Sequence, residues 1–189
     1  MQKTITYFDK PGKANTDECL SIVLKAIDEY TYKHVVVAST NGDTGVLFAE
    51  RLKDMNINLV VVTHSFGFKE PNTIELTDEA RKRIVSAGGR IYTGTMITHS
   101  LETAMAKQFS GVYPTLLVAQ TLRLFGEGIK VCCEMTMMAT DAGLIPESEE
   151  IVTVAGTGYG ADAVAVLRAA ASKRFFDLKV LEILAKPRG

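Results

Sequence analysis

Residues 39–45 combine hydroxyl and amide side chains with two glycines and follow a β-branched run at residues 34–38. The polar and glycine positions are Ser39, Thr40, Asn41, Gly42, Thr44 and Gly45. If a helix begins here, its first N–H groups lack intrahelical partners and its end carries partial positive charge, so the segment can bind a phosphate. An ordinary turn with Asp43 or Thr44 as N-cap is the alternative. Because one capping hydroxyl would suffice and three are present, we favour the phosphate site.

A second glycine-rich turn follows the apolar run at residues 151–155. It contains Gly156, Thr157, Gly158, Gly160 and Asp162. The glycine spacing departs from the dinucleotide-binding fingerprint, and the acidic residue comes too early. Close approach of the backbone to a ligand and tight packing of a helix on a strand remain as alternatives.

Two further loops carry polar and aromatic residues after apolar runs. The first contains Thr63, His64, Phe66, Gly67 and Phe68, and the second contains Thr93, Gly94 and Thr95. Aromatic faces in a glycine-containing loop can stack on a flat ring system. Taken singly, a loop phenylalanine more often closes a core and a lone histidine more often makes a structural hydrogen bond. Together with the phosphate segment, the loops predict one shared crevice.

Several other kinds of site are not indicated. We find no Ser-His-Asp order, no metal-ligand cluster and no Walker pattern, so no catalytic residue and no metal site is assigned. The methionines at residues 135–138 have helical spacing and are interpreted as core. Cys19, Cys132 and Cys133 lack the spacing of a disulfide framework or a zinc site, and we expect reduced, apolar helix residues.

Composition bounds the class of protein. The 189 residues fit one α/β domain over residues 1–189, and 47% hydrophobic with 23% charged residues suits a soluble globular chain. A net charge of -1 gives no basic face for nucleic acid. With no membrane-spanning run and no signal peptide, we expect a cytoplasmic location and no membrane partner. A homo-oligomer is left open.

Helical and strand patterns alternate along the chain. A short strand-like segment at residues 4–8 comes first, and strands are expected at residues 34–38, 58–63, 90–93, 151–155 and 178–184. Helices are expected from an Asn15–Glu18 capping box to Tyr30, at residues 44–54, from a cap near Thr77, from near Ser100, from Pro114, at residues 131–142 and at residues 161–172. The last strand is partly polar and is expected at an edge, antiparallel to the others.

This alternation predicts a three-layer α/β/α domain with a mostly parallel five-stranded sheet and one antiparallel strand. In such sheets ligands bind beyond the carboxyl ends of the strands, where all four polar loops fall.

The same residues resemble a known family. The run at residues 35–45, Thr63-His64 with Gly67-Phe68, Thr93-Gly94-Thr95 and the glycine turn with Asp162 are similar to stand-alone relatives of the pyruvate kinase C-terminal domain. The resemblance implies a five-stranded mixed sheet between helix layers.

In pyruvate kinases the corresponding first loop holds a phosphate of a sugar bisphosphate activator. Ser39, Gly42 and Thr44 match its pattern, whereas Asn41 replaces a hydroxyl and Asp43 stands where Arg is frequent. The resemblance therefore implies a single phosphate. Because 189 residues are too few to contain the catalytic barrel of the kinase as well, we expect no pyruvate kinase activity.

Stand-alone relatives are similar to proteins found with bound flavin mononucleotide (FMN). The resemblance implies that the hydroxyl loop holds the phosphate and that the aromatic loops hold the ring, in a flavoprotein or a flavin-dependent oxidoreductase. A non-catalytic sensor for a phosphorylated metabolite is the alternative. A phosphatase or other hydrolase, with His64 and then Asp162 as candidate bases, is a third.

Overall fold

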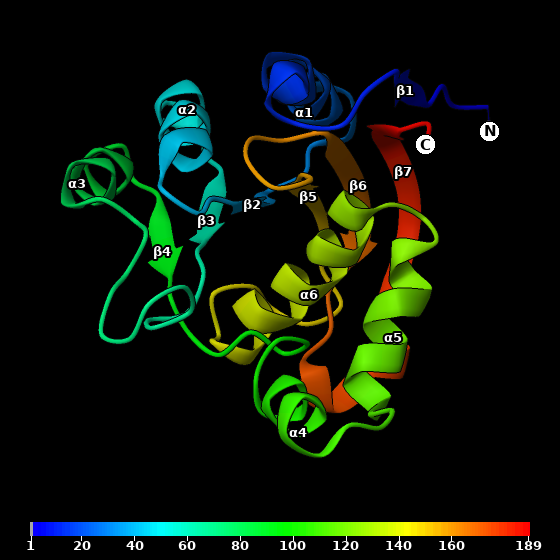
Figure 1. Ribbon diagram of the computed structural model, residues 1–189. Coiled ribbons are helices and arrows are strands. Elements are labelled where there is room, and N and C mark those ends of the chain that lie inside the picture. The colour runs from blue at the N-terminus through cyan, green and yellow to red at the C-terminus, as the bar shows by residue number, and fades with distance from the viewer. Residues whose placement is uncertain (1) are drawn as a thin grey trace.

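The protein was analysed as a computed structural model, which describes residues 2–189 (Figure 1). Its central sheet has the strand order β1-β7-β6-β5-β2-β3-β4. The strands are β1 (Thr6–Phe8), β2 (His34–Ala38), β3 (Asn58–Val62), β4 (Arg90–Tyr92), β5 (Glu150–Ala155), β6 (Ala163–Arg168) and β7 (Lys179–Pro187). All neighbouring strands pair in parallel except at β6, which is antiparallel to both β5 and β7.

Helices cover both faces of the sheet and make three layers (Figure 1). One layer holds α1 (Thr16–Tyr30), α2 (Asp43–Leu52) and α3 (Asp78–Ser86); the other holds α6 (Glu127–Asp141), with α5 (Pro114–Arg123) and α4 (Leu101–Phe109) beyond it. Short 3-10 helices span Lys13–Asn15 and Ser172–Asp177.

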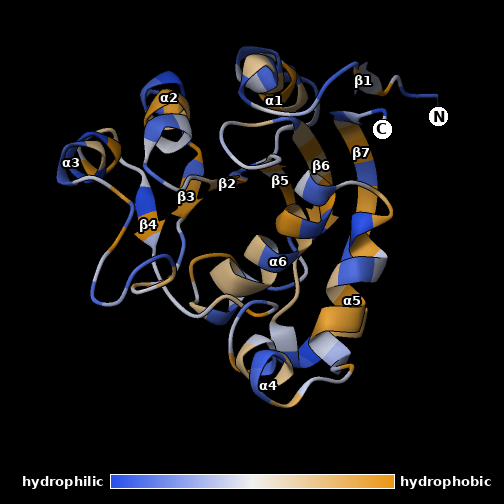
Figure 2. Cartoon of the chain, viewed as in Figure 1, coloured by the Kyte–Doolittle hydropathy of each residue, from blue (hydrophilic) through white to orange (hydrophobic). Residues whose placement is uncertain are grey.

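The β-branched strands owe their burial to this double cover. Val35 and Val37 pack in the cluster under α1 and α2, while Val36 packs in the cluster under α6. A strand apolar on both faces is typical of a parallel sheet between helix layers. The hydropathy colouring shows hydrophobic residues along the strands and on α5, with hydrophilic residues on parts of α2, α3 and α4 (Figure 2).

The predicted helix at residues 161–172 is wrong, because half of this segment is strand β6 and the segment holds no α-helix. Alanine-rich composition favours a helix, but Ala163 to Leu167 are all buried between the two helix layers. Ala163 and Ala165 face α6, whereas Val164 faces the α1 layer. Small side chains are needed there because α6 approaches closely: a Cβ on Gly128 of α6 would overlap the Cβ of Ala163.

The sheet has seven strands among the described residues, and the prediction of five is wrong. The two additional strands are β6 and the short β1, which pairs with β7. Consequently β7 is not an edge strand and is not reversed with respect to β5; the one antiparallel strand is β6. The family-level expectation of a mixed sheet between helix layers is confirmed.

The capping signals in the sequence predict one helix start correctly and another incorrectly. Thr77 caps α3 as predicted, since its hydroxyl accepts a hydrogen bond from the Ala80 N–H at 3.1 Å. The predicted Asn15–Glu18 capping box is wrong: the Asn15 side chain donates instead to the carbonyls of Lys10 and Gly12. The preceding 3-10 turn leaves Asn15 in a helical conformation, which is unsuited to an N-cap.

The three cysteines are free and buried, on α1 and α6 as expected. Burial raises the pKa of Cys19 and that of Cys133 to about 12. These thiols therefore stay protonated and unreactive at neutral pH. Within residues 2–189, no helix has the length and apolar character needed to span a bilayer.

The contact between Gly128 and Ala163 yields a stability prediction. We expect Gly128→Ala to lower the free energy of unfolding by about 1–3 kcal/mol, because overpacking outweighs the better helix propensity of alanine. Urea unfolding monitored by circular dichroism measures this. Thr121→Ala, at an exposed position of α5, is the control and should change little. Unchanged stability of Gly128→Ala would contradict the close packing of α6 on β6.

Candidate functional site

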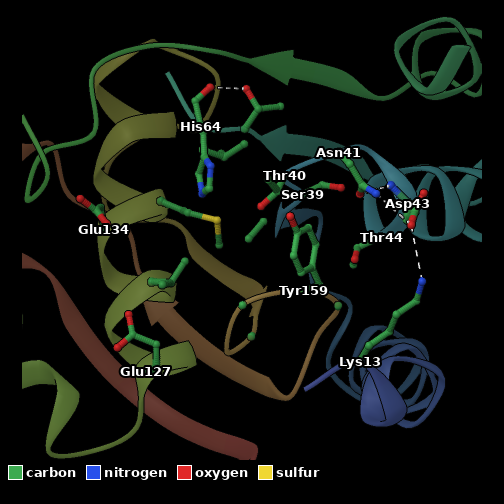
Figure 3. A pocket seen from close by; sticks show the side chains of 18 of the residues that line it. Lys13, Ser39, Thr40, Asn41, Asp43, Thr44, His64, Glu127, Glu134 and Tyr159 are labelled. Atoms are coloured by element: carbon green, nitrogen blue, oxygen red, sulfur yellow. Dashed lines mark hydrogen bonds and ion pairs between the residues drawn. The ribbon is translucent and has the colours of Figure 1, made fainter. Parts of the chain in front are cut away.

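A cleft of about 640 Å³ opens at the carboxyl ends of β2, β3 and β5. The chain leaves β2 for β3 on one side, and β5 lies on the other side of β2, so this is a point where the strand order switches. Such points leave a crevice between diverging loops. The cleft is bounded by the start of α2, the glycine turn after β5 and the side of α6 (Figure 3).

The start of α2 forms one end of the cleft. Thr44 occupies the second helical position, and neither its hydroxyl nor its backbone N–H has a hydrogen-bond partner among residues 2–189. The N-cap is Gly42, so the alternative that Asp43 or Thr44 caps this helix is wrong. A free hydroxyl and a free N–H at a helix N-terminus are suited to an anion.

Two side chains shape this turn from within. The Ser39 hydroxyl accepts a hydrogen bond from the Gly45 N–H at 3.0 Å, and the Asn41 carbonyl oxygen accepts one from the Asp43 N–H at 3.2 Å. Gly42 has a φ of 107°, and a Cβ there would overlap Ala80 of α3. These contacts fix the direction of the first turn of α2, and Figure 3 shows Ser39, Thr40, Asn41 and Thr44 gathered beside it.

The rim at this end carries one charge of each sign. Lys13 Nζ lies 3.5 Å from Asp43 Oδ2, and both side chains are exposed. Lys13 comes from the 3-10 turn before α1, so segments far apart in sequence meet here. The exposed ammonium can turn toward an anion bound at α2, which offsets the repulsion from Asp43.

The glycine turn after β5 forms a wall of the cleft, but most of its predicted residues serve the fold. A Cβ on Gly160 would overlap the backbone of Lys13, and one on Gly156 would overlap the Gly160 carbonyl. The Asp162 carboxylate is fully buried, and its Oδ2 accepts hydrogen bonds from the N–H groups of Gly12 and Thr157. Asp162 therefore ties the turn to the segment before α1 and does not line the cleft, which removes one candidate base of the hydrolase hypothesis.

Between the two ends the cleft is apolar. Its floor consists of Leu47, Val62, Met96, Val131, Met135 and Met138. Met135 and Met138 are buried in the α6 cluster, as the core interpretation predicts, and they also reach the cleft. The Tyr159 ring stands over the space between α2 and α6 (Figure 3).

The α6 end of the cleft holds a buried polar network. Lys130 Nζ donates to Glu134 Oε2 at 2.6 Å, and the two residues are 1% and 2% exposed. Glu134 Oε1 accepts from the backbone N–H and the hydroxyl of Thr98, each at 2.7 Å. His99 Nδ1 lies 3.0 Å from that hydroxyl and 3.4 Å from Lys130 Nζ.

The carboxylate of Glu134 is held ionised by this network. Burial alone raises its pKa, but His99, Lys130 and the Thr98 N–H outweigh burial and lower the pKa to about 2. Lys130 and Glu134 thus form a fully desolvated ion pair beside the cleft.

A second histidine lies on the β3 side of the cleft. His64 Nδ1 is 2.7 Å from Glu75 Oε2, and the ring packs on Phe68 with centroids 4.3 Å apart. Phe68 in turn lies 6.3 Å from the His99 ring. The His64 side chain points from the end of β3 into the cleft (Figure 3).

The structure gathers only some of the predicted site residues around the cleft. Those lining it are Ser39, Thr40, Asn41, Thr44, Thr63, His64, Phe68, Gly156, Gly158 and Gly160. Those not lining it are Gly42, Gly45, Phe66, Gly67, Thr93, Gly94, Thr95, Thr157 and Asp162.

The residues outside the lining mostly have structural contacts. The Thr93 hydroxyl bonds to that of Thr63 at 2.7 Å, and the Gly67 N–H donates to the Thr73 carbonyl. A Cβ on Gly45 would press on Val61 of β3. Phe66 is 62% exposed, and we find no contact that explains it.

Sequence reasoning missed Lys13, Tyr159, His99 and the Lys130–Glu134 pair. The pair carried a usable signal, because oppositely charged residues four apart in an otherwise apolar helix indicate a buried ion pair. Nothing local places Lys13 near α2.

Comparison with known families matches residues 17–167 to the pyruvate kinase, alpha/beta domain family. The chain belongs to this family. Among solved structures, it is 15% identical to a pyruvate kinase from Cryptosporidium parvum, with a TM-score of 0.42 over 85% of this chain and 24% of that one. An O-ureido-L-serine synthase is 20% identical, with a TM-score of 0.33 over 52% of this chain and 30% of that one. The chain thus spans about a quarter of the length of the kinase. Structural similarity this low says nothing about the activity of the present chain.

The Lys130–Glu134 pair yields a pH prediction. Because the Glu134 pKa is about 2 in the folded protein and near 4.5 in the unfolded chain, the carboxylate contributes stability above about pH 4.5. This contribution, on the order of 3 kcal/mol, should be lost as the pH falls from about 5 to 2.

Urea unfolding at a series of pH values measures this loss. The double variant Lys130→Met/Glu134→Leu should lack that component of the acid sensitivity, whereas Glu50→Gln, in an exposed pair with Arg83, should retain it. If the free energy of unfolding fell with pH in parallel for the wild type and the double variant, the assignment of this acid sensitivity to Glu134 would be contradicted.

Proposed function

We propose that the cleft binds a phosphorylated ligand with a planar ring, that this ligand is FMN, and that the protein is a flavin-dependent oxidoreductase. The observation that carries the proposal is the division of one cleft into an anion-binding end at α2 and an apolar, aromatic-bordered body reaching α6. A phosphate ester of a large planar ring has the same division of chemistry.

The phosphate end has the donors that a phosphate monoester needs. Thr44 offers its hydroxyl and its N–H at the positive end of the α2 dipole, and the Thr40 side chain lies beside it (Figure 3). Lys13 supplies a cation within reach of the rim. Lys13 is one exposed cation and Asp43 opposes it, so the rim suits one phosphate better than two. This agrees with Asn41 and Asp43, the two positions at which this loop differs from the kinase pattern.

The body of the cleft suits a flat ring. Thioethers such as those of Met96, Met135 and Met138 make favourable contacts with aromatic rings, and Tyr159 and Phe68 offer ring faces at the border. The volume of about 640 Å³ falls within the range of pockets for small molecules and cofactors. The polar network on α6 then lies beside the far end of such a ring, which supports a redox role.

Replacing Thr44 tests the phosphate end. Thr44→Ala removes a hydrogen bond to a charged group, so FMN binding should weaken by about 1.5–3 kcal/mol, roughly tenfold to hundredfold. Binding of riboflavin, which lacks the phosphate, should change little. Titration calorimetry with both compounds gives the discrimination directly.

The matched control is Thr77→Ala. Thr77 caps α3, so this variant should lose about 1 kcal/mol of stability and keep the wild-type preference for FMN over riboflavin. Equal wild-type affinity for the two compounds would refute the phosphate site. A Thr44→Ala protein with undiminished preference would remove Thr44 from it.

A further inference from the structure

We propose that His99, positioned by Thr98 and Glu134, takes up a proton when FMN bound in the cleft is reduced. This inference rests on the proposed binding of FMN and adds a proton-transfer residue to it. His99 lines the cleft at its α6 end, and His99 Nε2 has no hydrogen-bond partner within the described part of the chain.

The hydrogen-bond chain behind His99 defines which ring nitrogen is free. The Thr98 hydroxyl has one proton, which it donates to Glu134 Oε1 at 2.7 Å. That hydroxyl oxygen is then an acceptor for His99 Nδ1, 3.0 Å away, whereas the Lys130 ammonium, which can only donate, lies farther from Nδ1, at 3.4 Å. The neutral ring then carries its proton on Nδ1 and presents the lone pair of Nε2 to the cleft. The ionised Glu134 stabilises this order through the threonine.

The position of His99 relative to α2 brings it near the ring end of the ligand. A phosphate at Thr44 fixes one end of FMN at the N-terminus of α2, and the apolar floor leads from there to α6. Figure 3 shows the hydroxyl loop and Glu134 on opposite sides of this space. The part of the ligand farthest from the phosphate is the ring system, which therefore meets the network of His99 and Lys130.

Proton uptake by His99 follows from charge balance. Reduction of the bound ring by an external two-electron donor, such as dithionite, would add negative charge to the cleft. His99 borders the cleft with 31% of its side chain exposed, and negative charge on the ring beside it would favour the protonated imidazole, so Nε2 of His99 would take up a proton from solvent. The loaded protein would then take up one more proton per two electrons than a variant that lacks this imidazole.

The other charged groups around His99 do not cancel the coupling between reduction of the ring and proton uptake by His99. From α6 come Lys130 and Glu134, which form an ion pair, and Glu127, which lines the cleft and is paired with Arg123. From the β3 side come His64 and Glu75, separated from His99 by the Phe68 ring. From α4 comes Glu102, whose carboxylate is held by the N–H of Thr115.

The test measures the midpoint potential of bound FMN as a function of pH. The FMN-loaded protein is reduced stepwise with dithionite beside reference dyes at a series of pH values from about 6 to 8. Each additional proton per two electrons steepens the dependence by about 30 mV per pH unit, a tenfold change in equilibrium constant. The slope of midpoint potential against pH should be steeper in the wild type than in His99→Asn by up to this amount.

Three further variants separate a positioning role from general damage. Thr98→Ser keeps the hydroxyl and should keep the wild-type slope, whereas Thr98→Val should fall between the wild type and His99→Asn. His34→Asn is the matched control, because His34 begins β2 at the opposite end of the sheet and contacts Asn58. It should retain the wild-type slope.

The outcomes distinguish the two proposals. FMN binding with equal slopes in the wild type and His99→Asn would overturn the role of His99 alone. A slope lost in His64→Asn but kept in His99→Asn would also overturn it and assign the proton to His64. Failure of FMN to bind at all would overturn both proposals.

Discussion

Helix α6 lies closely against one face of the sheet because both surfaces carry small side chains at the contact. Gly128 meets Ala163 so tightly that a methyl group would not fit, and Ala165 and Ala139 pack in the same cluster. This contact sets how far α6 stands from the start of α2. Because the cleft is the space between them, its width depends on alanines and glycines that never touch a ligand. The same contact holds the side of α6 that carries Lys130, Glu134 and Met135 toward the cleft.

The two ends of the cleft differ in how their polarity is maintained. At α2, polarity comes from the free N–H and hydroxyl of Thr44 at the positive end of the helix, which are donors without any buried charge. At α6, it comes from an ion pair whose desolvation is offset by hydrogen bonds from Thr98 and by the proximity of His99. The apolar methionine floor lies between them. An elongated ligand with an anionic end and a ring that changes charge on reduction matches both ends.

Strand residues were predictable where burial and propensity agree. The β-branched runs of β2 and β3 indicate strands that are buried on both faces of a parallel sheet. The polar loops that follow them converge because parallel strands end at the same side of the sheet. The segment at residues 163–168 was mispredicted because its alanines favour a helix, whereas its pairing with the neighbouring strands β5 and β7 and its burial under α6 hold it extended. Within the site, Thr44 could be found from its position after a strand, whereas Lys13 and His99 reach the cleft only through tertiary packing.

Identification of the molecule that the purified protein carries tests the central claim most directly. The native protein is heated to release small molecules, which are identified by mass spectrometry, and its visible absorption spectrum is recorded before release. We predict a flavin spectrum and released FMN, with riboflavin absent or minor. A colourless protein that neither releases flavin nor quenches the fluorescence of added FMN would contradict the account.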